Sequence, residues 1–197
     1  MSSISTIEIV SRLRSLNVKL ITPTTISNTF GIKNKNTIYK ILERMEKYKL
    51  LDKLIKGKYI LSDTSISDFE KAGIILSPSY ISLESALSFY GILPQFTYSI
   101  TSVTTLRSRK YIVKGKEFEY TKISHRYFSD YVKKDNFLIA TPEKALIDLL
   151  YLASKKLRKP NLDEFDTSLI NWKEFNKIKS KIDYLPFKNY LKENNLW

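Results

Sequence analysis

The chain has 197 residues, 43% of them hydrophobic and 13% aromatic, which is enough for one domain of ordinary size or two small domains with buried cores. It contains no cysteine and one histidine, a composition that excludes disulfide frameworks, thiolate metal sites and cysteine–histidine nucleophiles. The formal net charge of +13 favours a polyanionic partner such as nucleic acid, although 26 lysines against 7 arginines are also typical of an AT-rich genome.

The N-terminal segment differs from an export signal. Its apolar pattern is interrupted by Glu8, Arg12 and Arg14, whereas a secretory signal needs an unbroken apolar core. No apolar run approaches the roughly 20 residues of a membrane span. We therefore expect a cytoplasmic protein that makes no membrane contact, and we expect no cofactor because no cofactor-binding motif is found.

Two helices are predicted near the N-terminus. Apolar side chains recur every third residue in residues 4–16, which predicts an amphipathic helix with Ile9 off its buried stripe and Ile4, Ile7, Val10, Leu13 and Leu16 on it. A short second helix follows, because Thr22 suits its N-cap, Pro23 its first position and Gly31 its end.

A third helix and a hairpin complete this half of the chain. The stretch "NKNTIYKILERMEKYKLL" can be capped by Asn34 or Asn36, and its predicted buried face is Ile38, Ile41, Leu42 and Met45. The strands "KLI" and "KYIL" meet at Lys56-Gly57, where glycine suits a tight turn. This order predicts a winged helix-turn-helix domain over residues 1–66, whose third helix enters the DNA major groove.

The positive charge of this half is concentrated on the third helix and the hairpin. Residues 1–75 hold 13 basic and 7 acidic residues, and the window 33–58 alone holds 9 basic and 3 acidic residues. Such a surface attracts phosphates through counterion release. The alternatives are a merely solvated helix face or a winged helix used for protein contacts. The predicted DNA-binding residues are Lys33, Lys35, Asn36, Thr37, Tyr39, Lys40, Arg44, Lys47, Lys56 and Lys58.

A second domain is predicted over residues 79–197, after a linker over residues 67–78. Segments rich in β-branched and aromatic residues, with a hairpin turn at Lys114-Gly115-Lys116, predict a small antiparallel sheet packed by helices. Ser82 and Thr141 suit helix N-caps, and further helices are expected over residues 163–180 and 183–194. The fold class predicted for the whole chain is α+β.

No catalytic or metal site is predicted. His125 is interpreted as a partly buried or surface histidine, and Glu117 and Glu119 as solvent-facing strand charges, although they faintly resemble a metal-dependent nuclease centre. Glu143 is interpreted as a first-turn helix charge and Asp148 as an exposed helix position. The role of a second basic surface is left open: it could contact DNA, bind an acidic protein or simply be solvated. This surface comprises Arg107, Arg109, Lys110, Lys114, Lys116 and Arg126.

Several blocks together carry a family resemblance. They are "GKYIL", "SYISLESALSFYGILPQ", "ITSVTTLRSRKY" and "FLIATPEKALIDLLYL", over roughly residues 5–155. Their order resembles the AbiEi antitoxins of type IV toxin–antitoxin and abortive-infection systems. The resemblance implies a winged helix that binds inverted repeats of double-stranded DNA in its own promoter. It also implies a C-terminal domain that counteracts a nucleotidyltransferase toxin without a stable complex.

The sequence leaves two other functions open. One is a stand-alone winged-helix regulator whose second domain senses a ligand or a partner. The other is a nucleic-acid enzyme, which we do not expect.

Overall fold

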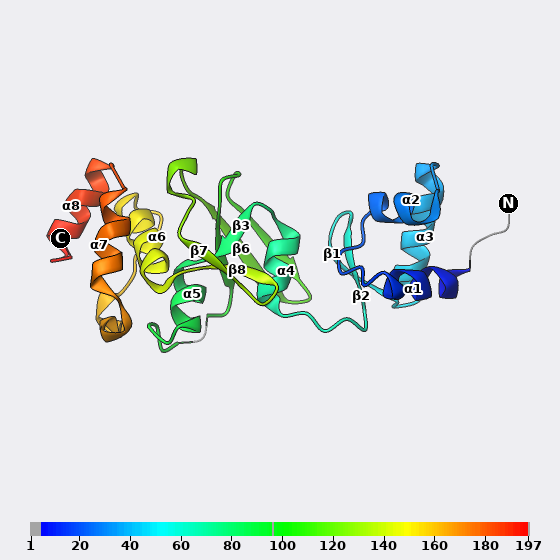
Figure 1. The fold of residues 1–197 in the computed structure, drawn as a ribbon, viewed down its shortest axis with the longest axis horizontal. Helices are drawn as coiled ribbons and strands as arrows, with labels where there is room; N and C mark the ends of the chain where they lie inside the picture. Colours follow the sequence, from blue (N-terminus) through cyan, green and yellow to red (C-terminus); the bar gives the residue numbers. More distant parts are fainter. Residues whose placement is uncertain (1–4, 96, 197) are drawn as a thin grey trace. The chain divides into compact units, whose positions relative to one another are not determined.

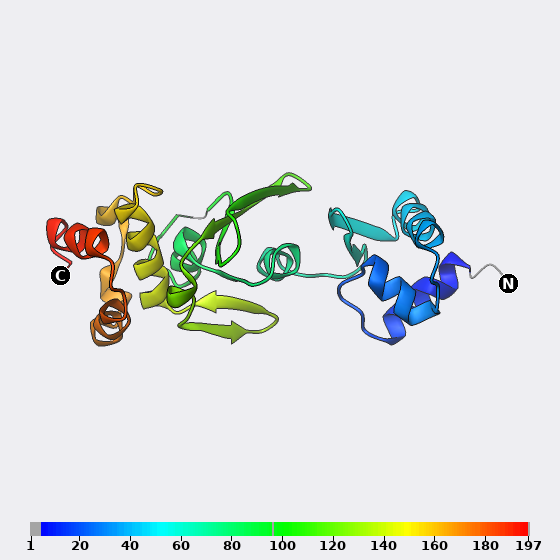
Figure 2. The ribbon, with the colours of Figure 1, turned by 90° about the horizontal axis from the view of Figure 1, so that it is seen from above.

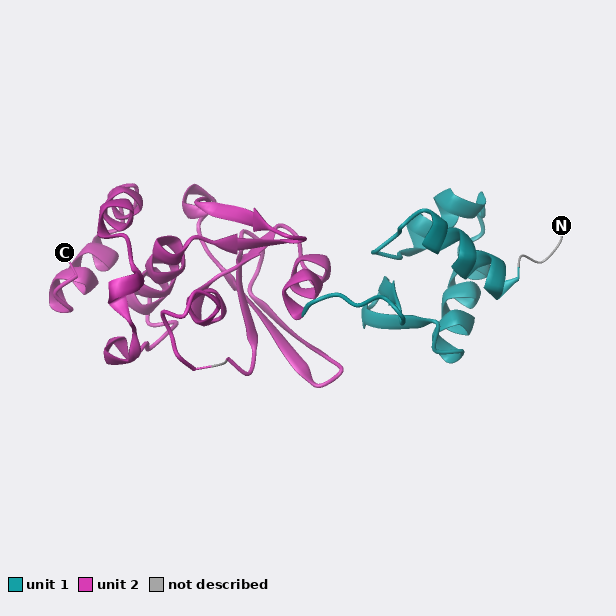
Figure 3. Cartoon of the chain, turned by 60° about the horizontal axis from the view of Figure 1, so that its bottom comes forward, with its two compact units in different colours: residues 1–67 teal, residues 68–197 magenta. Residues whose placement is uncertain are grey.

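The computed structural model describes residues 5–95 and 97–196 and divides the chain into two compact units, residues 1–67 and 68–197 (Figure 3). The fold is α+β, as predicted. Unit 1 has three helices and one two-stranded sheet, whereas unit 2 has a six-stranded sheet and the remaining helices of the described residues. Ile4, expected in the first helix, lies outside the described residues.

Unit 1 consists of three helices followed by an antiparallel hairpin (Figure 1): α1 (Thr6–Ser15), α2 (Pro23–Phe30), α3 (Lys35–Lys47), β1 (Leu51–Ile55) and β2 (Lys58–Leu61). Thr22 caps α2 by accepting from the amide of Thr25, and Gly31 ends it with a φ of 67°. A backbone bridge between Ile21 and Tyr59 ties the segment before α2 to the hairpin. Local capping and turn chemistry therefore fix the ends of these elements as expected.

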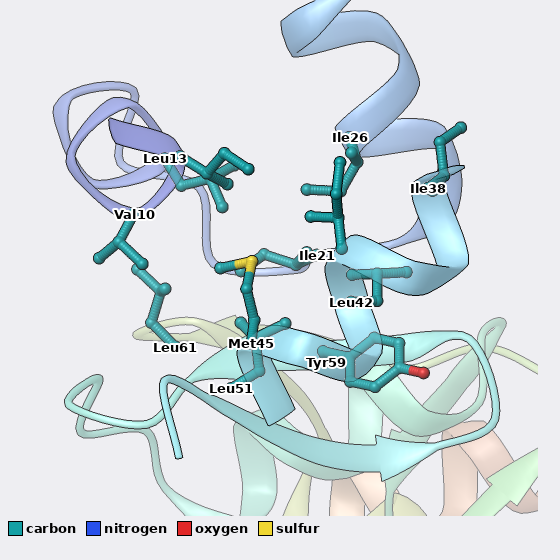
Figure 4. Close-up of a cluster of buried hydrophobic side chains, with 12 residues drawn as sticks. Val10, Leu13, Ile21, Ile26, Ile38, Leu42, Met45, Leu51, Tyr59 and Leu61 are labelled. Atoms are coloured by element: carbon teal, nitrogen blue, oxygen red, sulfur yellow. The ribbon is translucent and has the colours of Figure 1, made fainter. Parts of the chain in front are cut away.

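The core of unit 1 is one apolar cluster to which all three helices and both strands contribute (Figure 4). The face predicted for α3 is buried there. The stripe predicted for α1 is partly wrong, because Ile7 is 82% exposed and Leu16 is 47% exposed, whereas Ile9 is completely buried beside Val10 and Leu13. Steps of three residues drift around a helix of 3.6 residues per turn, so the packing partners decide which side turns inward.

Unit 2 is built on a mixed sheet with the strand order β5-β6-β4-β3-β8-β7. Four of these strands, β3, β6, β7 and β8, are labelled in Figure 1. The bounds of its strands are β3 (Ser79–Ile81), β4 (Ile100–Thr104), β5 (Arg109–Val113), β6 (Lys116–Lys122), β7 (Tyr131–Lys134) and β8 (Phe137–Ala140). The small antiparallel sheet that was predicted is therefore only partly correct: β3–β4, β5–β6 and β7–β8 pair antiparallel, but β4 pairs with β6 and β3 pairs with β8 in parallel. Residue alternation identifies strands, but it does not choose their neighbours.

The predicted linker is mostly a helix of unit 2. Residues 68–75 form α4 (Asp68–Ile75), which packs against β3, β4 and β8. The Tyr120 hydroxyl in β6 donates a 2.7 Å hydrogen bond to the carbonyl oxygen of Ala72. Ser, Asp and Thr dominate residues 62–68 and suggested a loop, but Phe69, Ala72 and Ile75 give the following segment an apolar side to bury.

The other helices of unit 2 form layers beside the sheet. They are α5 (Leu83–Phe89), α6 (Pro142–Ser154), α7 (Trp172–Ser180) and α8 (Leu185–Glu193). Helix α6 packs against α5 and β8 and lies between the sheet and the pair α7 and α8 (Figure 2). The helix predicted over residues 163–180 begins only at Trp172, after two short 3-10 turns at Leu162–Glu164 and Thr167–Leu169. A third such turn covers His125–Tyr127.

Candidate nucleic-acid interface

Helix α3 is positioned by an N-cap at its start and by an apolar face that packs in the core of unit 1. The side chain of Asn34 accepts a hydrogen bond from the amide of Thr37 at 3.2 Å, which starts the helix. Its apolar stripe is nearly or fully buried against α1, α2 and the hairpin, and comprises Ile38, Ile41, Leu42 and Met45. Figure 4 labels three of these residues, Ile38, Leu42 and Met45. The remaining residues of the helix are exposed, except Arg44 and Glu46, which are half-exposed.

The exposed face of α3 is centred on a slightly different set of residues from the one predicted. Successive residues turn by about 100° around the axis, which places Asn36, Lys40, Glu43 and Lys47 opposite the buried stripe. All four are exposed. Tyr39, 52% exposed, lies at one border of this face. Glu43 was not among the predicted DNA-binding residues, and its carboxylate lowers the charge at the centre; carboxylates can accept from cytosine N4.

Arg44 and Thr37 lie toward the other border of the face. Thr37 is exposed, but Arg44 is only half-exposed, and its Nε is shielded from solvent without a hydrogen-bond partner among the described residues. A guanidinium with one shielded nitrogen has fewer donors available to a ligand. Arg44 is therefore a weaker candidate for a base contact than Lys40.

The hairpin presents lysines at its turn. Strands β1 and β2 pair antiparallel up to Ile55 and Lys58, and Lys56-Gly57 forms the two-residue turn. Gly57 has a φ of 78°, a conformation that favours glycine. Lys56 is exposed and Lys58 is half-exposed. The turn chemistry inferred from the sequence therefore places Lys56 at the tip of the hairpin.

Most of the basic residues of this surface lack an intramolecular ion partner. Within residues 5–95 and 97–196, no carboxylate forms a salt bridge with Lys33, Lys35, Lys40, Lys47 or Lys56. Lys33 and Lys35 are exposed at the start of α3. Their charges remain available to an external anion, and phosphate groups are the most common one at such surfaces.

The second basic stretch does not form one cluster. Lys110 is committed to Glu117 at 3.0 Å and Glu119 at 3.5 Å, and the hydrogen bond to Glu117 raises the pKa of Lys110. Arg107 and Arg109 lie at one end of β5, whereas Lys114 and Lys116 lie at the β5–β6 turn, about 16 Å away along a five-residue strand. Arg126 belongs to a 3-10 turn after β6. These six residues therefore lie at separate places in unit 2 and do not form the single basic surface that was considered.

The residues weighed for catalysis are also dispersed. His125 is exposed in a 3-10 turn, and Glu119 forms a salt bridge with Arg158 at 2.8 Å. Glu143 accepts a hydrogen bond from the amide of Asn171 at 3.0 Å. Across the described ranges, no three acidic or histidine side chains gather in a way that could hold a metal ion.

One polar cluster was missed from the sequence. Asp148, expected to be exposed, is 2% exposed and pairs with the ammonium of Lys144, which is 1% exposed. Tyr80 and Ser82 donate hydrogen bonds to Asp148 at 2.9 and 2.8 Å. Burial raises the pKa of Asp148, and the Lys144 ammonium opposes that shift. Ser82 therefore makes no side-chain cap to α5, contrary to prediction.

These four side chains join two of the blocks that carry the family resemblance. Tyr80 and Ser82 come from β3 and the residue after it, and Lys144 and Asp148 come from α6, so the cluster fixes the helix to the sheet. The signal in the sequence was the i, i+4 spacing of a lysine and an aspartate on an otherwise apolar helix. The cluster is enclosed, so its evident role is to orient α6.

Comparison of the chain with models of known protein families and with curated proteins finds no match. In the part of the chain that the structure describes, no helix combines the length and the apolar character needed to cross a bilayer. The surface chemistry of unit 1 and the sequence resemblance are therefore the two grounds for assigning a function.

Proposed function

We propose that unit 1 is a winged helix-turn-helix domain that binds double-stranded DNA, with α3 in the major groove and the β1–β2 turn against the backbone. One observation carries this proposal: α3 buries a complete apolar face and leaves exposed a face with Asn36, Lys40 and Lys47, and the β1–β2 turn of the same unit carries an exposed Lys56. An α-helix fits the major groove, and lysine and asparagine side chains can reach phosphates and base edges.

We further propose that the protein represses its own promoter and serves as the antitoxin of a type IV system against a nucleotidyltransferase toxin. The support for this part is the resemblance to AbiEi antitoxins, of which the blocks around Tyr80 and Thr141 belong to unit 2. In this proposal the protein is not an enzyme, needs no cofactor and acts in the cytoplasm. The alternative is a stand-alone regulator whose unit 2 senses a ligand or partner.

The DNA proposal is tested by measuring binding to the DNA upstream of the protein's own gene and to a shuffled sequence of equal length. The double variant K40A/K47A should weaken binding by about 10- to 100-fold at about 100 mM salt and reduce the salt slope by about 2, or about 1 for each phosphate that is no longer neutralised. The matched control K173A/K177A removes two exposed lysines from α7 and should leave affinity unchanged.

Two results would contradict the DNA proposal. Equal affinity for the upstream and shuffled sequences would exclude a specific repressor. Equal losses in K40A/K47A and in the α7 control would show that only total charge matters. The variant R44A should have a smaller effect than K40A, because Arg44 is partly shielded.

The antitoxin proposal is tested by co-expression with the product of the adjacent gene. The full chain and a fragment of residues 68–197 should each relieve toxicity, because the activity is assigned to unit 2. The fragment begins at residue 68 so that it keeps α4, which packs on the sheet. Toxicity that persists with both proteins, when both are folded and expressed, would reject the antitoxin role.

A further inference from the structure

The sheet of unit 2 has two edge strands, β5 and β7, each of which pairs with a neighbour on one side. The backbone N–H and C=O groups on the outer side of an edge strand can pair with a strand of another molecule. All four residues of β7 are exposed, and its apolar side chains are Tyr131, 36% exposed, and Val132, 45% exposed. Strand β7 is therefore open along its whole length.

The pairing of β7 with β8 decides which backbone groups of β7 face outward. In an antiparallel pair, residues that bond to the partner strand alternate with residues whose N–H and C=O point away from it. The amide of Thr141 donates to the carbonyl oxygen of Asp130 at 3.1 Å, so Asp130 and the second and fourth residues of β7 bond toward β8. The outward groups belong to Tyr131 and Lys133, and within the described residues they have no hydrogen-bond partner.

A second copy of β7 can meet these groups in three antiparallel registers, because the outward residues of the two strands must face each other. Tyr131 opposite Tyr131 leaves the groups of Lys133 unpaired. Lys133 opposite Lys133 sets two ammonium groups directly across from each other, which is destabilising. Tyr131 opposite Lys133 uses the outward groups of both residues in both strands. This last register has its two-fold axis at Val132.

The side chains along β7 suit the register centred on Val132. In this register Lys134 of one copy lies opposite Asp130 of the other, and Lys133 lies beside the ring of Tyr131. The two Val132 side chains meet at the axis, where pairing removes their exposed apolar surface from water. Opposite charges, apolar pairs and lysine–aromatic pairs that face each other across two strands stabilise the pairing.

The other edge strand, β5, lacks this self-complementarity. Residues 130–135 contain two aspartates and two lysines, so two copies of the β7 segment meet without net repulsion. Residues 107–116 contain no carboxylate, so two copies of the β5 segment would bring only positive charges together. The basic residues of this segment are Arg107, Arg109, Lys110, Lys114 and Lys116.

We propose that two copies of the protein dimerise through β7, in the antiparallel register centred on Val132, and so join their sheets into one. The contact uses the same surface on both copies, so it closes as a dimer and does not extend into a filament. One short strand from each copy makes a small interface, so we expect a dissociation constant of about 10 µM to 1 mM. The inference goes beyond the proposed function and does not depend on DNA binding or on the antitoxin role.

Disulfide trapping in the full-length protein tests the register, because the natural chain contains no cysteine. V132C should form a disulfide-linked dimer under mild oxidation, since residues that face each other at such an axis have Cα atoms about 4.5 Å apart, within the span of a disulfide. I112C is the matched control on β5, where Ile112 is 75% exposed. It should crosslink at least about tenfold more slowly, because no pairing holds its thiols together.

Sedimentation equilibrium of the full-length protein measures the association without crosslinking. K133P removes an outward N–H that β8 does not use, so the hairpin is kept and dimerisation should weaken by at least about tenfold. K134E places a carboxylate opposite Asp130 and should weaken dimerisation to a similar degree. The control K173E reverses an exposed charge on α7 and should leave the association unchanged.

Three results would overturn the proposal. The first is a protein that stays monomeric up to about 1 mM, which would mean that the lysines of β7 protect a free edge. The second is crosslinking of V132C no faster than that of I112C. The third is an equal effect of K134E and K173E on association. Binding of a polyglutamate peptide to a monomeric protein would instead assign the edge to an acidic partner. All of these measurements are made without DNA, so their failure is distinct from that of the DNA-binding proposal.

Discussion

At the scale of single residues, Ile7 and Ile9 show how a sequence pattern and a core can disagree. They are two positions apart and therefore about 200° apart around α1, so both cannot face the same core. The regular steps of three residues favoured Ile7, yet Ile7 is 82% exposed and Ile9 is fully buried. Ile9 shares its side of the helix with Leu13, four residues later, and with Val10. The spacing of apolar residues established that a helix forms, and the packing of α2, α3 and the hairpin decided its rotation.

The first prediction compares these two isoleucines. I9A should destabilise unit 1 by about 2 to 5 kcal/mol because it leaves a cavity in the core, whereas I7A should change stability by less than about 0.5 kcal/mol. Hydrogen exchange of the α3 amides in the full chain measures both effects. Equal protection in the two variants would contradict the buried position of Ile9.

The second prediction concerns Asp130, which the Lys181 ammonium approaches at 2.9 and 3.1 Å. Burial alone would raise the pKa of Asp130, but the Lys181 hydrogen bond and a further one from Ser129 outweigh it and lower the pKa below its ordinary 3.8. A lowered carboxyl pKa contributes stability above the unfolded value, and that stability is lost as the pH falls through the folded value.

K181M should therefore be about 0.5 to 1 kcal/mol less stable than the original protein at neutral pH, a small value because Lys181 is half in solvent. The difference should shrink as the pH falls below 3.8. Urea unfolding of both proteins across this range measures the effect. A difference independent of pH would mean that Lys181 stabilises by packing alone.

At the scale of elements, the start of α6 is specified by residues close in the sequence, whereas the extent of its burial is specified by the elements packed around it. Thr141 accepts from the amide of Lys144, and Pro142 occupies the first turn, so the start of the helix was predictable. The buried side of α6 was underestimated, because β8, α5, α7 and α8 enclose it and even Lys144 and Asp148 are buried. Their mutual pairing and the donors from Tyr80 and Ser82 compensate part of the desolvation cost.

The third prediction tests this pair. K144M leaves the Asp148 carboxylate buried without its cation and should cost about 3 to 5 kcal/mol. K144M/D148N should be more stable than K144M alone by at least about 1 kcal/mol, because a neutral asparagine can still accept from Tyr80 and Ser82. Urea unfolding followed by tryptophan fluorescence measures both, with K173M as an exposed control expected within about 0.5 kcal/mol.

A double variant no more stable than K144M would show that the ionic pair is not the reason for the destabilisation. The remaining cause would then be the packing of the lysine methylenes.

At the scale of the whole molecule, the boundary between the units depends on α4. The polar composition after Ser62 suggested a linker up to Pro78, yet Asp68–Ile75 forms a helix that packs on the sheet of unit 2. A short segment with few apolar residues gives a weak helical signal in the sequence. The helix is stabilised instead by packing its apolar side against the apolar face of the sheet. The two units have separate cores, so each can be perturbed by itself.

The fourth prediction compares two fragments. Residues 68–197 should unfold cooperatively, whereas residues 76–197 should unfold at a lower temperature and bind a hydrophobic dye. The shorter fragment uncovers the sheet and removes the acceptor of the buried Tyr120 hydroxyl. Far-UV circular dichroism and dye fluorescence measure the difference. Matching melting curves would show that α4 contributes nothing to unit 2.

The sequence by itself determined the helix caps at Thr22 and Thr141 and the turns at Gly57 and Gly115, and it narrowed the cap of α3 to Asn34 or Asn36, of which the structure uses Asn34. It also determined the buried stripe of α3 and the concentration of lysines opposite it. These features depend on residues close together in the chain, so they can be predicted from short stretches of sequence. Only the tertiary structure decided the parallel pairs of the sheet, the helix in the expected linker, the rotation of α1 and the burial of Asp148. Each of these depends on partners far away in the sequence, and no local pattern selects them.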